Sequence, residues 1–114
     1  MALNFATSNP KALLDAFKQA IDEKHIVTWS YDKDGDFTHV PDQWKNQAWF
    51  RPSIFNGQLT LNFLANKRVT TTKALYGVYH GRFIEAMLTH CDKLFSTAVA
   101  TAMPTNSDNI QTAA

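Results

Sequence analysis

The stretch Gln47–Ala65, QAWFRPSIFNGQLTLNFLA, decides the fold because it predicts a complete β-hairpin. Asn56-Gly57 is the dipeptide most typical of a two-residue type I′ turn, and alternating apolar residues flank it on both sides. That loop opposes four apolar pairs: Ile54 with Leu59, Pro52 with Leu61, Phe50 with Phe63, and Ala48 with Ala65. We expect this side of the hairpin to face the core, since a one-residue slip would mix apolar and polar residues.

The opposite side of this hairpin is unusually apolar for a surface. It carries Trp49, Arg51 and Phe55, and Trp44 precedes the first strand in the linker 41–46. Trp and Arg are residue types that anchor protein interfaces. Two alternatives stay open: a helix or the linker covers this side, or the side is uncovered and binds a partner.

Two further features of the sheet follow from single residues. Pro52 has no N–H, so its strand is expected to lie at a sheet edge or to carry a bulge. Upstream, Ile26–Asp32 and Phe37–Val40 flank Asp34-Gly35, which predicts a second two-residue turn. That turn would oppose Trp29 with Val40 and Tyr31 with Thr38, and bury one side made of Val27, Trp29, Tyr31 and Val40.

Helices are expected before and after the hairpins. Asn9 and Pro10 suit the start of a helix over 9–25, as N-cap and first helical residue. A long helix is expected over 72–98, with a buried stripe of Ile84, Leu88, Cys91 and Phe95. Gly77 and Gly81 extend this stripe and predict a close approach to large sheet residues such as Trp29 or Phe63. The alternative is a strand over Ala74–Tyr79 that turns at His80-Gly81.

The predicted fold class is therefore α+β: an N-terminal helix, a four-stranded antiparallel sheet of two hairpins, and a long C-terminal helix packed on the sheet. Residues 1–103 form a single domain in this interpretation. Residues 104–114 are polar and poor in bulky side chains, which predicts a disordered C-terminal tail.

The composition excludes some classes of function but does not indicate a particular one. The 114 residues carry 11 Lys and Arg against 10 Asp and Glu, a balance that does not favour nucleic acid or an acidic membrane. No secretory signal and no apolar run of membrane-spanning length is present, and Cys91 is the single cysteine. These features predict a cytoplasmic protein without membrane insertion or disulfides.

No motif indicates an enzyme, a cofactor or a metal. Asp32-Lys-Asp-Gly-Asp36 resembles the start of a calcium loop, but its glycine is fourth instead of sixth, so we interpret it as a turn. His80 and His90 are separated by about 15 Å along a helix, too far to share an ion. Cys91 is a nucleophile only in an open, electropositive site, and its place in the apolar stripe favours core packing.

Three functional hypotheses follow from the residues. The first is a non-enzymatic interaction module with a protein partner or a homodimer contact through Trp44, Trp49, Arg51 and Phe55. The second is a small-ligand binder or enzyme with a pocket between long helix and sheet, lined by His80 and Arg82. The third is single-stranded nucleic-acid binding through stacked aromatic residues, which the net charge of +1 does not favour.

Overall fold

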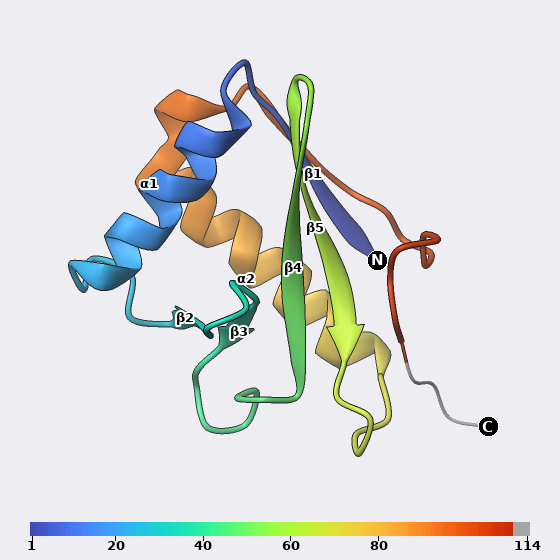
Figure 1. Ribbon diagram of the computed structural model, residues 1–114. Helices are drawn as coiled ribbons and strands as arrows, with labels where there is room; N and C mark the ends of the chain where they lie inside the picture. The colour runs from blue at the N-terminus through green and yellow to red at the C-terminus, as the bar shows by residue number, and fades with distance from the viewer. Residues whose placement is uncertain (111–114) are drawn as a thin grey trace.

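The computed structural model describes residues 1–110 and shows an α+β fold (Figure 1). Six strands form one antiparallel sheet in the order β2-β3-β4-β5-β1-β6. The elements are β1 (Ala2–Ala6), α1 (Pro10–Asp22), β2 (Trp29–Tyr31), β3 (Phe37–His39), β4 (Ala48–Phe55), β5 (Gln58–Ala65), α2 (Lys73–Cys91), the 3-10 turn η1 (Asp92–Leu94) and β6 (Thr97–Ala100). Neither helix in this part of the chain is long and apolar enough to cross a membrane.

The β4–β5 hairpin has the predicted register. All four apolar pairs are confirmed. Gly57 has a positive φ of 78°, but Asn56 lacks the positive φ that a type I′ turn also needs, so the predicted turn type is wrong. Phe50, Leu61 and Phe63 are fully buried on the core side. Ile54 differs, because it lies near the hairpin tip and is 49% exposed.

The first hairpin has a different register from the predicted one. Trp29 lies opposite His39 instead of Val40, so the pairing is shifted by one residue. Phe37 takes a fully buried position in the observed register, whereas Val27, predicted on the buried side, is exposed. The two-residue turn at Asp34-Gly35 is therefore wrong.

A longer loop explains this shift. The Asp32 carboxylate accepts hydrogen bonds from the backbone N–H groups of Asp34 (2.9 Å) and Asp36 (3.0 Å). The Gly35 N–H donates to the Asp32 carbonyl, and Gly35 has a φ of 84°. A turn closed by this side chain uses the whole of Asp32–Asp36, because the aspartate replaces backbone partners inside the loop.

The four-stranded sheet of the prediction is too small, since β1 and β6 add two strands. β1 pairs with β5, and its Leu3 and Phe5 side chains are fully buried. β6 pairs with the other side of β1 and forms an end of the sheet. Consequently the predicted helix over 72–98 ends at Cys91, and its last part is η1 and a strand.

Both helices begin as their sequences predict. The Asn9 side chain accepts from the Ala12 N–H at the start of α1, and the Thr72 side chain accepts from the Leu75 N–H at the start of α2. Residues 74–79 are helical, which removes the alternative of a strand there. α1 ends at Asp22, three residues earlier than predicted, where the chain turns through Lys24 with a φ of 63°.

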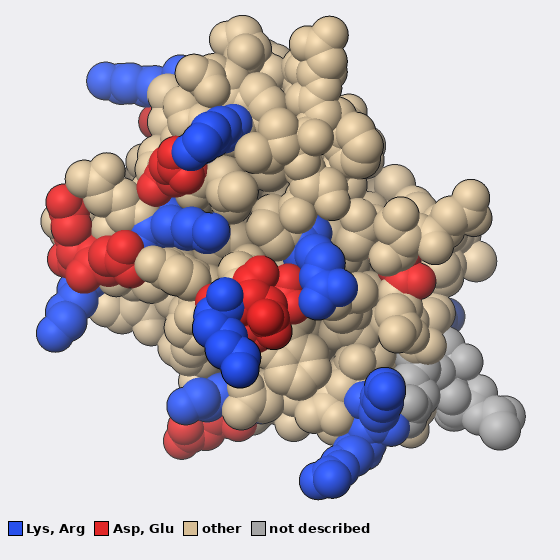
Figure 2. Space-filling view, in the orientation of Figure 1, with Lys and Arg blue, Asp and Glu red and all other residues tan. Residues whose placement is uncertain are grey.

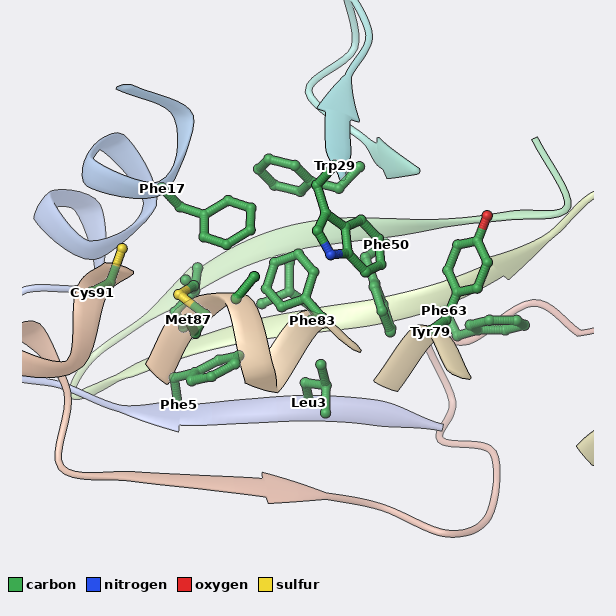
Figure 3. Packing of buried hydrophobic residues seen from close by; sticks show 14 of the residues in the cluster. Leu3, Phe5, Phe17, Trp29, Phe50, Phe63, Tyr79, Phe83, Met87 and Cys91 are labelled. Atoms are coloured by element: carbon green, nitrogen blue, oxygen red, sulfur yellow. The ribbon is translucent and has the colours of Figure 1, made fainter. Parts of the chain in front are cut away.

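Both helices pack on the same side of the sheet, around Phe83 of α2 (Figure 3). The Phe83 ring stacks on Phe17 of α1 with centroids 4.6 Å apart, and it also contacts Trp29 at 5.0 Å and Phe50 at 5.4 Å. The buried stripe of α2 consists of Leu75, Tyr79, His80, Phe83, Ala86, Met87 and Cys91. Cys91 is in the core as predicted, whereas Leu88 is 53% exposed, so that part of the predicted stripe is wrong.

The two helix glycines do not mark a close approach. Gly77 and Gly81 are exposed, and a Cβ added at either one would meet no atom within 4 Å. The predicted contact with Trp29 or Phe63 is therefore wrong. These glycines weaken the helix without a packing reason in the described residues.

Replacing Gly81 with alanine is accordingly expected to stabilise the protein. Gly81→Ala should raise the free energy of unfolding by about 0.5–1 kcal/mol, because alanine restricts the unfolded chain and meets no neighbour. Urea denaturation measures the change. Gly57→Ala is the control and should lower stability, because Gly57 has a φ of 78°. A Gly81→Ala protein less stable than wild type would contradict the open surroundings of this residue.

β4 is an interior strand in the sheet order, so the predicted edge strand is wrong, but Pro52 itself lies where β4 has one neighbour. β3 pairs with β4 at Phe50 alone, so the half of β4 that contains Pro52 is paired only with β5. The segment after β6 returns to β5 on the side away from β4, where Asn109 forms a bridge with Leu64. The predicted disordered tail covers 104–114; residues 105–109 of it contact the sheet, and residues 111–114 lie outside the described residues.

Candidate interaction surface

The side of the sheet away from α1 and α2 is called the outer face below. β4 contributes Trp49, Arg51, Ser53 and Phe55, and β5 contributes Gln58, Thr60, Asn62 and Leu64. Trp49 is partly exposed and Phe55 is 55% exposed. Both helices pack on the core side, so no helix of residues 1–110 covers Trp49.

Arg51 is held in place by Asp36. Its Nε donates to Asp36 Oδ1 at 3.0 Å, and its Nη2 donates to Asp36 Oδ2 at 2.8 Å, a two-point pair of fixed orientation. The Asp36 side chain is 8% exposed, while that of Arg51 is 57% exposed. The hydrogen bonds that Arg51 donates to Asp36, and the negative charge of Asp36, raise the pKa of Arg51. Nη1 has no partner among the described residues, so the guanidinium keeps donors for another molecule.

Charges of both signs lie side by side on this face. Figure 2 shows acidic and basic side chains gathered next to one another, with a largely uncharged area above them. Asp32, Lys33 and Asp34 are exposed in the loop that ends at Asp36. This loop puts negative charge directly beside the Arg51 guanidinium.

A row of hydrogen-bonded polar side chains borders the aromatic residues. Asn4 Oδ1 accepts from Gln58 Nε2 at 3.0 Å and from Thr60 Oγ1 at 2.8 Å. Asn62 Nδ2 donates to Asp108 Oδ1 at 2.8 Å. With Phe55 and residues 105–107 these side chains line a shallow hollow of about 310 Å³. The alternation of the hairpin predicts the outward side of Thr60 and Asn62, but no local signal connects them to Asn4.

Asp108 fastens the returning segment at this row. Burial raises the pKa of the Asp108 carboxyl, but hydrogen bonds from Thr105 and Asn62 and a nearby positive charge outweigh burial and lower it. The ionised carboxylate therefore accepts from Asn62 and from the Thr105 N–H. Thr105 and Asp108 thus cover the Asn62 end of the outer face.

Trp44 is separated from the other predicted contact residues. The linker turns back on itself, with the N–H groups of Trp44 and Lys45 both donating to the Pro41 carbonyl. Trp44 consequently packs against the core and lines a hollow of about 230 Å³ together with His39 and Arg82. Trp44 therefore lies beside α2 and not beside Trp49, so the predicted grouping of these two residues is wrong. The direction of a linker is set by its turn and not by strand alternation.

His80 and Arg82 do not form a shared pocket. His80 is 7% exposed, with its ring 5.0 Å from that of Phe50 and 5.7 Å from that of Phe63. Arg82 is exposed and pairs with Glu85. Residues two apart on a helix point about 200° apart, so His80 packs on Phe50 and Phe63 while Arg82 lies at the hollow beside Trp44. The predicted pocket lining of these two residues is therefore wrong.

Another hollow, of about 440 Å³, lies between residues 6–9 and 93–96, where Thr7 Oγ1 donates to the Leu94 carbonyl and Asn9 caps α1. Those polar groups serve the fold. In residues 1–110 no three His, Cys, Asp or Glu side chains are grouped so that they could hold a metal ion. Burial, and then the charge of Asp92, raise the pKa of the Cys91 thiol, which disfavours a reactive thiolate.

The geometry therefore brings together Trp49, Arg51 and Phe55 on one face and places Trp44, His80 and Arg82 elsewhere. Comparison with known proteins adds no family to this description: no protein-family model, no curated protein and no solved structure matches the chain.

Proposed function

We propose that the protein is a non-enzymatic interaction module that self-associates through its outer face, with Trp49, Arg51 and Phe55 at the contact. The observation that carries the proposal is that both helices pack on the core side, so these three side chains reach the surface. Exposed aromatic residues beside an oriented arginine are the chemistry of interface anchors. A cytoplasmic location is part of the same proposal and rests on the sequence alone.

The charge pattern favours a second copy of the chain as the partner. Each outer face carries the Arg51 guanidinium and, beside it, the exposed Asp32 and Asp34. A two-fold axis between two such faces sets the basic group of one copy against the acidic loop of the other, which a uniformly charged face could not do. The net charge of +1 adds little repulsion between copies.

The paired substitution Trp49→Ala, Phe55→Ala tests this contact. Light scattering after size-exclusion chromatography should show the assembly mass falling by a factor of two, because the two aromatic anchors of the face are lost. The control is the paired substitution Val27→Ala, Leu88→Ala, which also removes two exposed apolar side chains, but from another part of the molecule. Equal masses for both paired variants and the wild type would refute the proposed contact, provided that circular dichroism shows all three folded.

A further inference from the structure

β6 is an end strand of the sheet, and no strand of residues 1–110 pairs with its outer side. It pairs with β1 on one side and is the last strand in the sheet order. Edge strands of soluble proteins are normally protected by charges, prolines, bulges or very short length. The open half of β4 has Pro52, and β2 has three residues, but no charged residue occurs between Leu94 and Ser107. β6 thus offers an extended backbone to another strand.

The pairing with β1 determines which backbone groups of β6 point outward. The Thr101 N–H donates to the Ala2 carbonyl at 2.9 Å, in the same register that opposes Leu3 with Ala100. Hydrogen-bonded and non-bonded positions alternate along an antiparallel pair. Val99 therefore also directs its backbone groups to β1, whereas Ala98 and Ala100 direct theirs to the open edge.

The sequence around these positions is symmetric. Residues 97–101 read Thr-Ala-Val-Ala-Thr in both directions, with Val99 at the centre. An antiparallel copy centred on Val99 opposes Ala98 with Ala100 of the second copy, and Ala100 with Ala98 of the second copy. Each opposed pair exchanges two bonds, so all outward N–H and C=O groups of Ala98 and Ala100 are used. Centring on Ala98 or Ala100 would leave some of them unpaired.

We propose that β6 is a self-association strand, which pairs antiparallel with β6 of a second copy around a two-fold axis at Val99. The two sheets then join into one continuous sheet across the axis. This contact goes beyond the outer-face contact, since it uses the sheet edge and different residues.

Exposed apolar side chains beyond the strand extend the contact. Met103 is 73% exposed, and Leu94 is 41% exposed at the other end of the segment. The chain bends at residues 102 and 103 and forms η1 over Asp92–Leu94, so in the register centred on Val99 these side chains contact the second copy from the ends of the paired strands. These contacts matter because backbone pairing over a few residues alone buries less than the roughly 1,200 Å² of a stable interface.

Charge at the symmetry axis provides the first test. Val99 is 55% exposed and would face Val99 of the second copy, so Val99→Lys opposes two like charges and should reduce the assembly mass by a factor of two. Val99→Glu should do the same, and a mixture of the two variants should restore the wild-type mass, because opposite charges then meet. Leu88→Lys, at a residue 53% exposed on α2, is the control and should keep the wild-type mass.

A cysteine at the axis provides a second test that does not depend on charge. Opposed residues of a non-bonded antiparallel pair have Cα atoms about 4.5 Å apart, which suits a disulfide. Val99→Cys should form a covalent dimer on mild oxidation, whereas Leu88→Cys should not, and the native Cys91 is buried in both.

The results separate this proposal from the outer-face contact. Restoration of mass by mixing, or the Val99→Cys dimer, in the Trp49→Ala, Phe55→Ala background supports the β6 contact whether or not the outer face associates. A monomeric wild type at all concentrations overturns both proposals. Two results overturn the β6 contact alone. The first is an unchanged mass for Val99→Lys. The second is a mixture of Val99→Lys and Val99→Glu that stays at the reduced mass, together with a Val99→Cys protein that forms no covalent dimer.

Discussion

Replacing Phe83 with alanine is expected to lower the free energy of unfolding by about 3–5 kcal/mol. Phe83 is fully buried, and its ring contacts Phe17 of α1, Trp29 of β2 and Phe50 of β4, as well as Phe5 and Phe37. One ring thus joins both helices to the sheet. Its loss leaves a cavity that rigid aromatic neighbours cannot fill, which adds a cavity cost to the lost burial.

Guanidinium denaturation of Phe83→Ala measures this loss, with Phe55→Ala as the control for the same chemical change at a 55% exposed residue. A domain of this size has a total stability of about 5–15 kcal/mol, so the loss in Phe83→Ala is between about a fifth and the whole of it. Phe55→Ala should stay close to wild type. Similar losses for the two variants would contradict the central position of Phe83.

The two hairpins show what a turn dipeptide predicts and what it does not. In β4–β5, eight opposed residues are all apolar, so the Asn56-Gly57 loop and the alternation support the same register. In β2–β3 each strand has three residues, and the alternation is too short to test a register. The Asp32 carboxylate, which binds two backbone N–H groups of the loop, then determines the loop length.

The errors in the predictions of β1, of β6 and of the buried side of α2 have related causes. β1 becomes a strand through pairing with residues 58–62, far along the chain, which no local pattern reports. The small residues of β6 suit a helix as well as a strand. α2 is apolar on more than one side, so spacing alone allowed Leu88 as a core residue. The aromatic rings of Tyr79 and Phe83, which pack against Phe50, determine the buried side.

The candidate surface was predictable to the extent that alternation determines it. Trp49, Arg51 and Phe55 were predicted on one side of a strand, and the structure places them there. The Asp36 partner of Arg51 could not be predicted, because it depends on the loop of the other hairpin. Trp44 is predicted at this surface because it is close in the sequence, but it lies elsewhere. His80 and Arg82 are predicted to line one pocket between α2 and the sheet, and the structure does not bring them together in one.

The two proposed contacts use different parts of the molecule. The axis that relates two β6 strands in one sheet is perpendicular to that sheet. The axis that relates two stacked outer faces lies between them, parallel to the sheets. Two such axes generate a closed tetramer where they intersect and an open filament where they pass each other. Because each contact is removed by its own substitutions, the two tests are independent.

Acid is expected to destabilise the protein from about pH 6.5 downward because of His80 and His39. Burial is the main cause that lowers the pKa of each from its ordinary value of 6.5; for His80 its backbone hydrogen bond to Tyr76 opposes the shift, and for His39 that to Thr28 does. In the unfolded chain both histidines bind protons near pH 6.5, while in the folded protein they stay neutral. Stability is therefore fully present above pH 6.5 and is lost as the pH falls towards the folded pKa values.

His80→Phe should reduce this pH dependence. Each such histidine contributes a slope of at most about 1.4 kcal/mol per pH unit, so removing His80 should take away one of the two contributions. Phenylalanine keeps the ring contacts with Phe50 and Phe63 and removes the buried imidazole. Urea denaturation between about pH 5 and pH 7.5 measures the slope. The lowered pKa of Asp108 acts in a separate window, below its ordinary value of 3.8.

The control for this experiment is His90→Phe, which removes an exposed histidine from the same helix. If wild type and His80→Phe lost stability in parallel as the pH fell, the acid sensitivity would come from groups other than the buried imidazole. A shallower slope in His80→Phe, with His90→Phe following the wild type, locates the sensitivity in the contact between α2 and the core side of the sheet. Because Phe50 packs on His80 and Arg51 follows it on the outer face, protonation at this point would also loosen the strand that carries the proposed contact residues.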